Sequence, residues 1–259
     1  MNIVVLVKQV PDTWAERSLK PSDNTLDRES VDAVINEVDE QAIEAGLRLQ
    51  EANGGEVTVV SMGPDRASES IRKALSMGAD KGLLISDPAL HGSCVMQTAK
   101  VLAAALGTLE WDIVLTGGES TDARLAVLPA LLAEATGAAQ LTQGRKISYE
   151  GGTFSVERVN EAGYAVVQSD GKAIVSLLEG TNEARYPSFK GIMAAKKKPL
   201  QTISLGDLGI SADEVGLDNA TTAVTGFENR PPRQSGAAVK DEGDGGVKIA
   251  DFLASRKLL

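Results

Sequence analysis

Few side chains in this sequence have the chemistry of a catalyst or a metal ligand. His91 is the only histidine and Cys94 the only cysteine, and both stand in the stretch LHGSC. One of each is too few for a zinc site with the usual ligand count. Neither belongs to a recognisable nucleophile motif, so we expect His91 in a turn or on the surface and Cys94 as a small buried residue. The sequence therefore predicts no catalytic residue and no metal site.

The stretch TGGESTDARLAV, residues 116–127, has the composition of a phosphate-binding turn. Glycines at the carboxyl end of a strand that leads into a helix are where an α/β fold places a ligand phosphate. Gly117 and Gly118 would let the backbone approach the ligand closely. The polar side chains that follow could cap the helix or contact the ligand, namely Ser120, Thr121 and Asp122. The SMGP stretch at 61–64 is expected to line the same rim.

Two common nucleotide motifs are missing from the sequence. The first predicted strand ends in KQVPD rather than in G-x-G-x-x-G, and no Walker A sequence is present. The turn at 116–127 is therefore the main nucleotide signal.

The stretch TNEARYPSFKGIMAAKKKP, residues 181–199, has the composition of a docking segment. The chain has only 2 Trp, 3 Tyr and 4 Phe, yet this stretch holds a Tyr, a Phe, an Ile-Met pair and three consecutive lysines. A core does not favour Lys196–Lys198, and a solvated surface does not favour Phe189, Ile192 and Met193. An alternative is that the lysines form the cationic last turn of a helix, which the helix dipole favours.

The elements that must position these residues alternate between strand and helix. Apolar, β-rich runs predict strands, and amphipathic runs predict helices that Asn36 and Ser93 can cap. The predicted strands are 2–10, 56–64, 81–87 and 111–118, and the predicted helices are 36–55, 65–79, about 93–106 and 123–136. Such alternation with short joints is typical of a doubly wound parallel sheet, which we predict for about residues 1–140.

Beyond residue 140 the pattern changes. We expect added hairpin strands over about 141–180, with a turn at Gly151-Gly152 and strands at YAVVQ and AIVSLLE. From residue 200 the periodicity is low, and 228–246 is too polar to pack alone. The chain ends in VKIADFLASRKLL, a short amphipathic helix that either wraps a partner or docks on its own domain. We therefore divide the chain into an α/β domain, 1–199, and a C-terminal arm, 200–259.

Composition narrows the possible environments and partners. The net charge of -10 argues against a nucleic-acid partner, because phosphate neutralisation needs clustered Lys and Arg. No window approaches the ~18 consecutive apolar residues of a membrane span. The first residues, MNIVVLVKQVPD, lack the features of a signal peptide. A single cysteine fits a reducing environment, so we expect a cytoplasmic protein.

Four stretches together resemble the beta, or small, subunit of electron-transfer flavoprotein. They are VLVKQVPDT near the start, IRKALSMGADKG at 71–82, the Gly-Glu-Ser-Thr-Asp turn, and NEARYPSFKGIMAAKKK. The last is the most specific, since it matches the family pattern almost throughout. The resemblance covers essentially the whole chain, including the PPRQSG stretch of the arm.

The resemblance implies an α/β fold of the adenine-nucleotide-binding type and a C-terminal arm that embraces an alpha subunit. It implies a heterodimer whose redox FAD is held mostly by the alpha subunit, with the beta subunit close to the flavin ring. The beta subunit commonly holds one AMP, and an FAD takes that place in electron-bifurcating relatives. Electrons would come from flavin dehydrogenases, such as acyl-CoA dehydrogenases, and leave to a membrane quinone oxidoreductase in fatty acid oxidation.

Residue by residue, the resemblance assigns a cofactor-binding set. Its members are Leu6, Val7, Lys8, Thr13, Asn36, Glu37, Val38, Asp39, Met62, Gly117, Gly118, Ser120, Thr121, Asp122, Ala123, Arg124, Ala126, Val127 and Leu128. Thr13 matches the position near the flavin ring, and no role is assigned to Trp14. The turn departs from the family, because Ala126, Val127 and Leu128 replace polar residues that would cradle phosphate. Backbone N–H groups and Arg124 could still bind it.

The resemblance also makes 182–198 a recognition loop that docks electron donors. Its partner-docking residues are Arg185, Tyr186, Pro187, Phe189, Ile192, Met193, Lys196 and Lys197. The apolar anchor falls on Phe189, with Ser188 as the cap of a short helix that ends before Pro199. We expect Phe189 to be exposed, and Ile192 and Met193 to pack on the domain itself.

The alternative is a stand-alone nucleotide-binding protein of the same fold group. An ATP pyrophosphatase would need a glycine-serine phosphate loop after the first strand, where this chain has KQVPD. A stress-type ATP-binding protein would lack the recognition segment and the long arm. Both features favour an electron carrier, in which the redox chemistry belongs to the flavin rather than to side chains.

Overall fold

The computed structural model describes residues 1–232, 236 and 238–259. Contacts within the chain divide it into two compact units, Met1–Thr225 and Gly226–Leu259. The sequence predicted an arm from residue 200, but residues 200–225 belong to the first unit. Residues 233–235 and 237, in and just after the PPRQSG stretch, lie outside the described residues.

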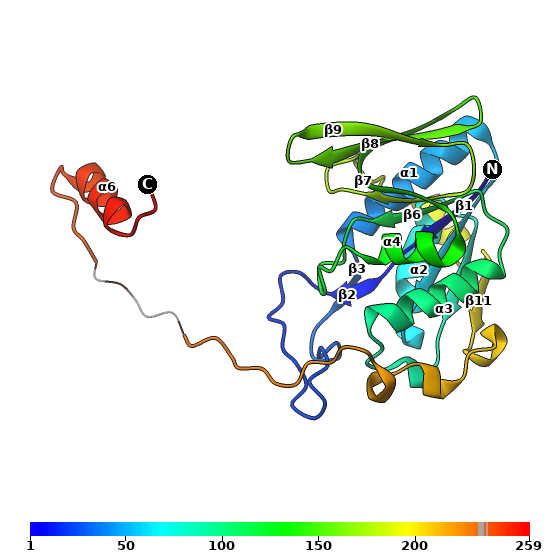
Figure 1. The fold of residues 1–259 in the computed structure, drawn as a ribbon, viewed down its shortest axis with the longest axis horizontal. Helices are drawn as coiled ribbons and strands as arrows, with labels where there is room; N and C mark the ends of the chain where they lie inside the picture. The colour runs from blue at the N-terminus through cyan, green and yellow to red at the C-terminus, as the bar shows by residue number, and fades with distance from the viewer. Residues whose placement is uncertain (233–235, 237) are drawn as a thin grey trace. The chain divides into compact units, whose positions relative to one another are not determined.

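A nine-stranded sheet forms the centre of the first unit, in the order β11-β5-β4-β1-β6-β10-β7-β8-β9 (Figure 1). Neighbours from β11 to β7 pair in parallel, and β7, β8 and β9 pair antiparallel. The strands are β1 (Asn2–Leu6), β4 (Glu56–Met62), β5 (Lys81–Ile85), β6 (Ile113–Gly117), β7 (Ala139–Glu150), β8 (Thr153–Asn160), β9 (Gly163–Ser169), β10 (Ala173–Leu177) and β11 (Leu200–Ile203). The mostly parallel sheet confirms the predicted α/β class.

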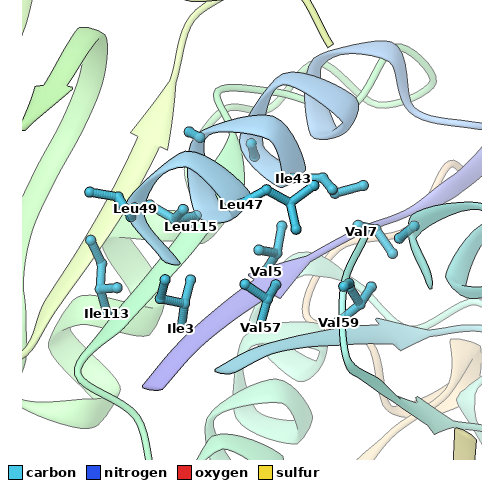
Figure 2. Packing of buried hydrophobic residues seen from close by; sticks show 14 of the residues in the cluster. Ile3, Val5, Val7, Ile43, Leu47, Leu49, Val57, Val59, Ile113 and Leu115 are labelled. Carbon is cyan, nitrogen blue, oxygen red and sulfur yellow. The ribbon is translucent and has the colours of Figure 1, made fainter. Parts of the chain in front are cut away.

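Helices cover both faces of this sheet, which explains its continuous apolar strands. Helices α1 (Glu37–Asn53) and α2 (Ser68–Met77) share one buried cluster with β1, β4 and β6. Figure 2 shows Ile43 and Leu47 of α1 beside Val5 of β1. Helices α3 (Val95–Gly107) and α4 (Leu128–Thr136) share a second buried cluster with the alternate residues of the same strands. This arrangement is the doubly wound fold that the sequence predicted.

Local boundaries differ from the predicted ones where side chains find other partners. The first strand ends at Leu6, and a separate strand β2 (Gln9–Pro11) pairs antiparallel with β3 (Ala33–Ile35). Ser93 does not cap α3. Its hydroxyl accepts from Gly216 N–H, and Cys94 takes the cap position, where Gln97 Oε1 accepts its N–H.

The strands after residue 138 extend the sheet as a hairpin and then return to its middle. The turn at Gly151-Gly152 joins β7 to β8 as predicted. Strand β9 pairs with β8, whereas β10 enters between β6 and β7 and pairs in parallel with both. The sequence predicted the strands but not this insertion.

The chain after β10 forms a short helix, α5 (Phe189–Ala195), and the edge strand β11, which pairs with β5. The 3₁₀ turns Gly206–Leu208, Ala212–Glu214 and Leu217–Asn219 follow. Leu205, Ile210 and Val215 are buried in the second cluster, so this part of the chain is core rather than arm. The second unit contains helix α6 (Gly245–Ser255), in agreement with the amphipathic pattern of the sequence.

Candidate functional site

The predicted nucleotide residues meet at the carboxyl edge of the parallel sheet. Lys8 follows β1, Met62 ends β4, and Gly117 ends β6. Strand β1 pairs with β4 on one side and β6 on the other, so the chain reverses its winding direction between β1 and β6. In doubly wound folds ligands bind in the crevice at this switch point.

A buried carboxylate, Asp39, joins the ends of β1 and β6. Its Oδ2 accepts from Lys8 N–H at 2.8 Å, and its Oδ1 accepts from Gly117 N–H at 3.1 Å. A Cβ at position 117 would collide with this carboxylate, which is why glycine is needed there. Burial raises the pKa of Asp39 to about 7, although the two N–H donors act in the opposite direction.

Asn36 holds the turn after β6 in place. Its Nδ2 donates to Glu119 O at 3.0 Å, and its Oδ1 accepts from Thr121 N–H at 3.0 Å. The prediction that its side chain caps α1 is therefore wrong, because the buried amide bonds to the neighbouring turn instead. Asn36 thus couples the start of α1 to the candidate phosphate turn.

Asp122 is a buried carboxylate that pairs with two half-buried cations. It pairs with Lys8 Nζ at 2.9 Å and with Arg28 Nη2 at 2.5 Å, and its side chain is 1% exposed. Burial alone would raise the pKa of Asp122, but the charges of Lys8 and Arg28 outweigh it and lower the pKa to about 2. Burial lowers the pKa of Lys8, against the attraction of Asp122.

Sequence reasoning did not find the further cations that lie near this turn. Arg17 Nη1 donates to Thr121 O at 2.5 Å, and Arg66 donates to Arg28 O. No local motif marks Arg17 or Arg28, since the fold brings them to the turn from distant positions, and Arg66 contacts Arg28 rather than the turn itself. Within the described residues, the buried Thr121 Oγ1 has no hydrogen-bond partner. A cationic rim with an unpaired hydroxyl fits a phosphate-bearing ligand such as a nucleotide.

Some of the remaining predicted cofactor residues are buried, and others are exposed. Buried behind the rim are Leu6, Val7, Val38 and Gly118, while Met62 is half-buried against the second cluster. Thr13 Oγ1 donates to the exposed Glu37 at 3.0 Å, and Trp14 is 93% exposed. The side chains of 123–127 are exposed, including those of Ala123, Arg124, Ala126 and Val127.

The turn is longer than the sequence predicted. Helix α4 begins at Leu128 rather than at residue 123, and Leu128 packs against the second buried cluster. Arg124 and Ala126 adopt left-handed backbone angles, with φ of 52° and 56°. That conformation is incompatible with a right-handed helix, which delays the start of α4.

The second predicted site is the docking segment, residues 182–198. Ser188 Oγ accepts from Gly191 N–H at 3.0 Å and caps α5, as predicted. Phe189 is 82% exposed, also as predicted. Ile192 and Met193 are 45% and 50% exposed, so the expectation that they pack on the domain is wrong. Helix α5 rests on the core through Ala195 instead, and all three apolar side chains share the outer face.

The other predicted docking residues are either exposed or held to the domain by ion pairs and hydrogen bonds. Tyr186 is 95% exposed, and Lys196 and Lys197 are also exposed, whereas Pro187 is half-buried. Arg185 bonds to two glutamates of α1, and Lys198 Nζ donates to three carbonyl oxygens at the end of α2. A Cβ on Gly191 would collide with Ser76 O, so α5 and α2 approach closely.

Two other features of the described chain bear on the kind of site. Within residues 1–232, 236 and 238–259, no cluster of three or more His, Cys, Asp and Glu side chains is arranged to hold a metal ion. In the same residues, every helix is too short or too polar to cross a bilayer.

Comparisons with known proteins agree with this architecture. The profile of the electron transfer flavoprotein domain family matches residues 23–208. The chain is 48% identical to the electron transfer flavoprotein subunit beta of Mycobacterium tuberculosis strain H37Rv, over 100% of this chain and 99% of that protein. It is 40% identical to the subunit beta of Thermoanaerobacterium thermosaccharolyticum, over 86% of each chain.

A third relative bears a different name. The acryloyl-CoA reductase electron transfer subunit gamma of Anaerotignum propionicum is 33% identical, over 98% of this chain and 97% of that protein. The family profile and the full-length similarity lead to one conclusion. The chain belongs to the electron transfer flavoprotein family and is similar over its whole length to the beta subunits of that family.

Proposed function

We propose that this chain is one half of a heterodimeric electron carrier, in which it pairs with an alpha subunit and shares a redox FAD with it. It takes electrons from flavin dehydrogenases, such as acyl-CoA dehydrogenases, and passes them to a membrane quinone oxidoreductase. The protein acts in the cytoplasm, in fatty acid oxidation. The names of its relatives support the carrier role, and one of them is the electron transfer subunit of an acyl-CoA reductase.

The observation that carries this proposal is the outer face of α5. Phe189, Ile192 and Met193 share that face, and the exposed Tyr186 precedes it. A cap at Ser188 and charged contacts on either side keep the segment folded. Exposed apolar residues on a fixed support are expected of a protein-binding site, and an aromatic anchor is the usual form of a hot spot. We propose that this face docks the electron donor.

The turn after β6, together with the cations around it, would hold an AMP. Lys8, Arg28 and the unpaired Thr121 hydroxyl would bind its phosphate, and Asn36 and Asp39 would hold the backbone of the rim around it. AMP supplies no redox chemistry, whereas the FAD would carry the electrons near Thr13. Since the side chains of 123–127 point to solvent, the phosphate would be bound by backbone N–H groups and by the half-buried cations Lys8 and Arg28. We further propose that the second unit, from Gly226, wraps the alpha subunit.

Replacing Phe189 with alanine tests the docking role. We expect the half-saturating concentration for electron transfer from an acyl-CoA dehydrogenase to rise roughly 30-fold, the factor for a hot spot of about 2 kcal/mol. The flavin content of the heterodimer should stay normal. Tyr164→Ala removes an exposed aromatic from β9 and serves as the control. Equal kinetics for the Phe189→Ala variant and the wild-type protein would refute the anchor.

Native mass spectrometry of the heterodimer tests the cofactors, followed by identification of each released small molecule. One FAD and one AMP are expected. Two FAD molecules would instead assign the site at the turn after β6 to a second flavin. One FAD alone would remove AMP from the proposal. A homomer carrying ATP would overturn the carrier function altogether.

A further inference from the structure

The docking segment is attached to the domain at both of its ends. Just before its start, Thr181 N–H donates to Gln41 Oε1 at 3.2 Å, and Nδ2 of its first residue, Asn182, donates to Gln41 O at 3.0 Å. At its end, Arg72 Nη1 donates to Ala195 O at 2.7 Å and to Lys198 O at 3.0 Å. Helix α1 therefore holds the first part of the segment, and α2 holds the last part.

Arg185 attaches the segment to two glutamates of α1, Glu44 and Glu51. Its Nε donates to Glu44 Oε2 at 2.7 Å, and its Nη2 donates to Glu44 Oε1 at 3.2 Å. The Arg185 backbone N–H also reaches Glu44 Oε2 at 3.2 Å, and Nη1 contacts Glu51 Oε1 at 2.5 Å. Paired N–H donors on one carboxylate fix the guanidinium in direction as well as in distance.

The two glutamates differ in their surroundings. The side chain of Glu44 is 4% exposed, whereas that of Glu51 is 58% exposed. A buried carboxylate that loses its cation is costly, while an exposed one is solvated by water. Arg48 Nε also donates to Glu44 at 2.6 Å, so the buried carboxylate is fully engaged. Glu44 is therefore the group that fixes Arg185.

The position of Arg185 controls the residues that follow it. Tyr186 is the next residue, Pro187 restricts the backbone through its fixed φ, and Ser188 caps the helix that carries Phe189. Only three residues separate the fixed guanidinium from the proposed anchor. A change in the position of Arg185 would therefore redirect the whole apolar face.

We propose that Glu44 is a positioning residue for donor docking: through Arg185 it fixes the direction in which Tyr186 and Phe189 leave the domain before any partner binds. This inference rests on the proposed docking function. A segment that is already ordered loses less conformational entropy on binding, which strengthens the complex without a new contact. Glu44 itself contacts no donor and lies beneath the surface.

The test uses the FAD-loaded heterodimer with Glu44→Gln, which keeps the shape of the side chain and removes its charge. Hydrogen exchange of the amides in 183–193 should become about tenfold faster, because local opening is easier. The half-saturating concentration of an acyl-CoA dehydrogenase should rise about tenfold, while the rate at saturation stays unchanged. Glu40→Gln is the matched control, since Glu40 lies on the same helix and pairs with Lys73.

Arg185→Lys provides a second variant if Glu44→Gln does not fold. Lysine keeps the charge but lacks the paired donors of arginine, so it should reproduce both effects. Exchange and half-saturation equal to those of Glu40→Gln would overturn the inference, provided that Phe189→Ala raises the half-saturating concentration in the same assay. If Phe189→Ala also has no effect, the docking function itself fails and the positioning role falls with it.

Discussion

Lys198 connects the docking segment to the end of α2, and its replacement by methionine has a calculable cost. The ammonium donates to Leu75 O at 3.1 Å, Gly78 O at 3.0 Å and Ala79 O at 2.6 Å. These carbonyl groups lie at the carboxyl end of the helix, where no intrahelical donor reaches them and the helix dipole favours a positive charge. Methionine keeps much of the apolar length of the side chain and removes the donor.

The expected loss of stability in Lys198→Met follows from the half-buried position of Lys198. A hydrogen bond to a charged group contributes about 1.5–3 kcal/mol, and water can replace part of what a half-exposed ammonium supplies. We therefore take the value of one such bond, about 2 kcal/mol, for all three contacts. If Met1–Thr225 unfolds as one unit, an entropy of about 2.1 cal/mol/K per residue converts this loss into a Tm decrease of about 4 °C.

Differential scanning calorimetry at matched protein concentration measures this decrease. Lys197→Met is the control, because Lys197 is the adjacent residue and is exposed. It removes the same charge, so any general effect of net charge cancels in the comparison. A decrease below about 1 °C for Lys198→Met, or equal decreases for the two variants, would refute the claim that Lys198 caps α2.

Two further predictions concern pH and the second unit. The pKa of Asp39 is raised to about 7, so the native state binds a proton that the unfolded chain releases. The free energy of unfolding should therefore fall between about pH 4 and pH 7, by up to about 4 kcal/mol. Urea titrations of the wild-type protein and Asp39→Asn at pH 5 and pH 7.5 measure this, and an equal fall in both would contradict it. Deleting residues 226–259 should weaken the heterodimer in size-exclusion chromatography but leave the Tm of the remaining chain unchanged, because Met1–Thr225 has its own core. An intact heterodimer after the deletion would count against the wrapping role.

The fold was largely predictable because its strands and helices carry strong periodic patterns. The runs NIVVL and EVTVV are apolar and β-branched, and such runs form strands that are covered on both faces. The insertion of β10 between β6 and β7 was not predictable, because no local pattern records which strand is the neighbour. Strand β11 was missed for a different reason, since four residues give too short a pattern to detect.

The candidate site was only partly predictable. Gly117 follows from the rule that ligands bind at the carboxyl edge of the sheet, whereas Lys8 and Asp39 were assigned only by the family resemblance. Arg17 and Arg28 lie in an irregular stretch with no motif, and only the folded chain brings them to Thr121 and Asp122. The burial of Ile192 and Met193 was predicted wrongly because an i, i+3, i+4 pattern shows that residues share a face but not which way that face points.

The insertion of β10 has a consequence for the order in which the protein can be made. During synthesis β6 and β7 emerge from the ribosome well before residues 173–177, and in the finished sheet they pair with β10 rather than with each other. Until β10 arrives, each therefore presents an open backbone edge of the kind that invites pairing with other chains. The nascent protein is most vulnerable to aggregation during this interval, and a chain that stops short of residue 173 keeps both edges open permanently.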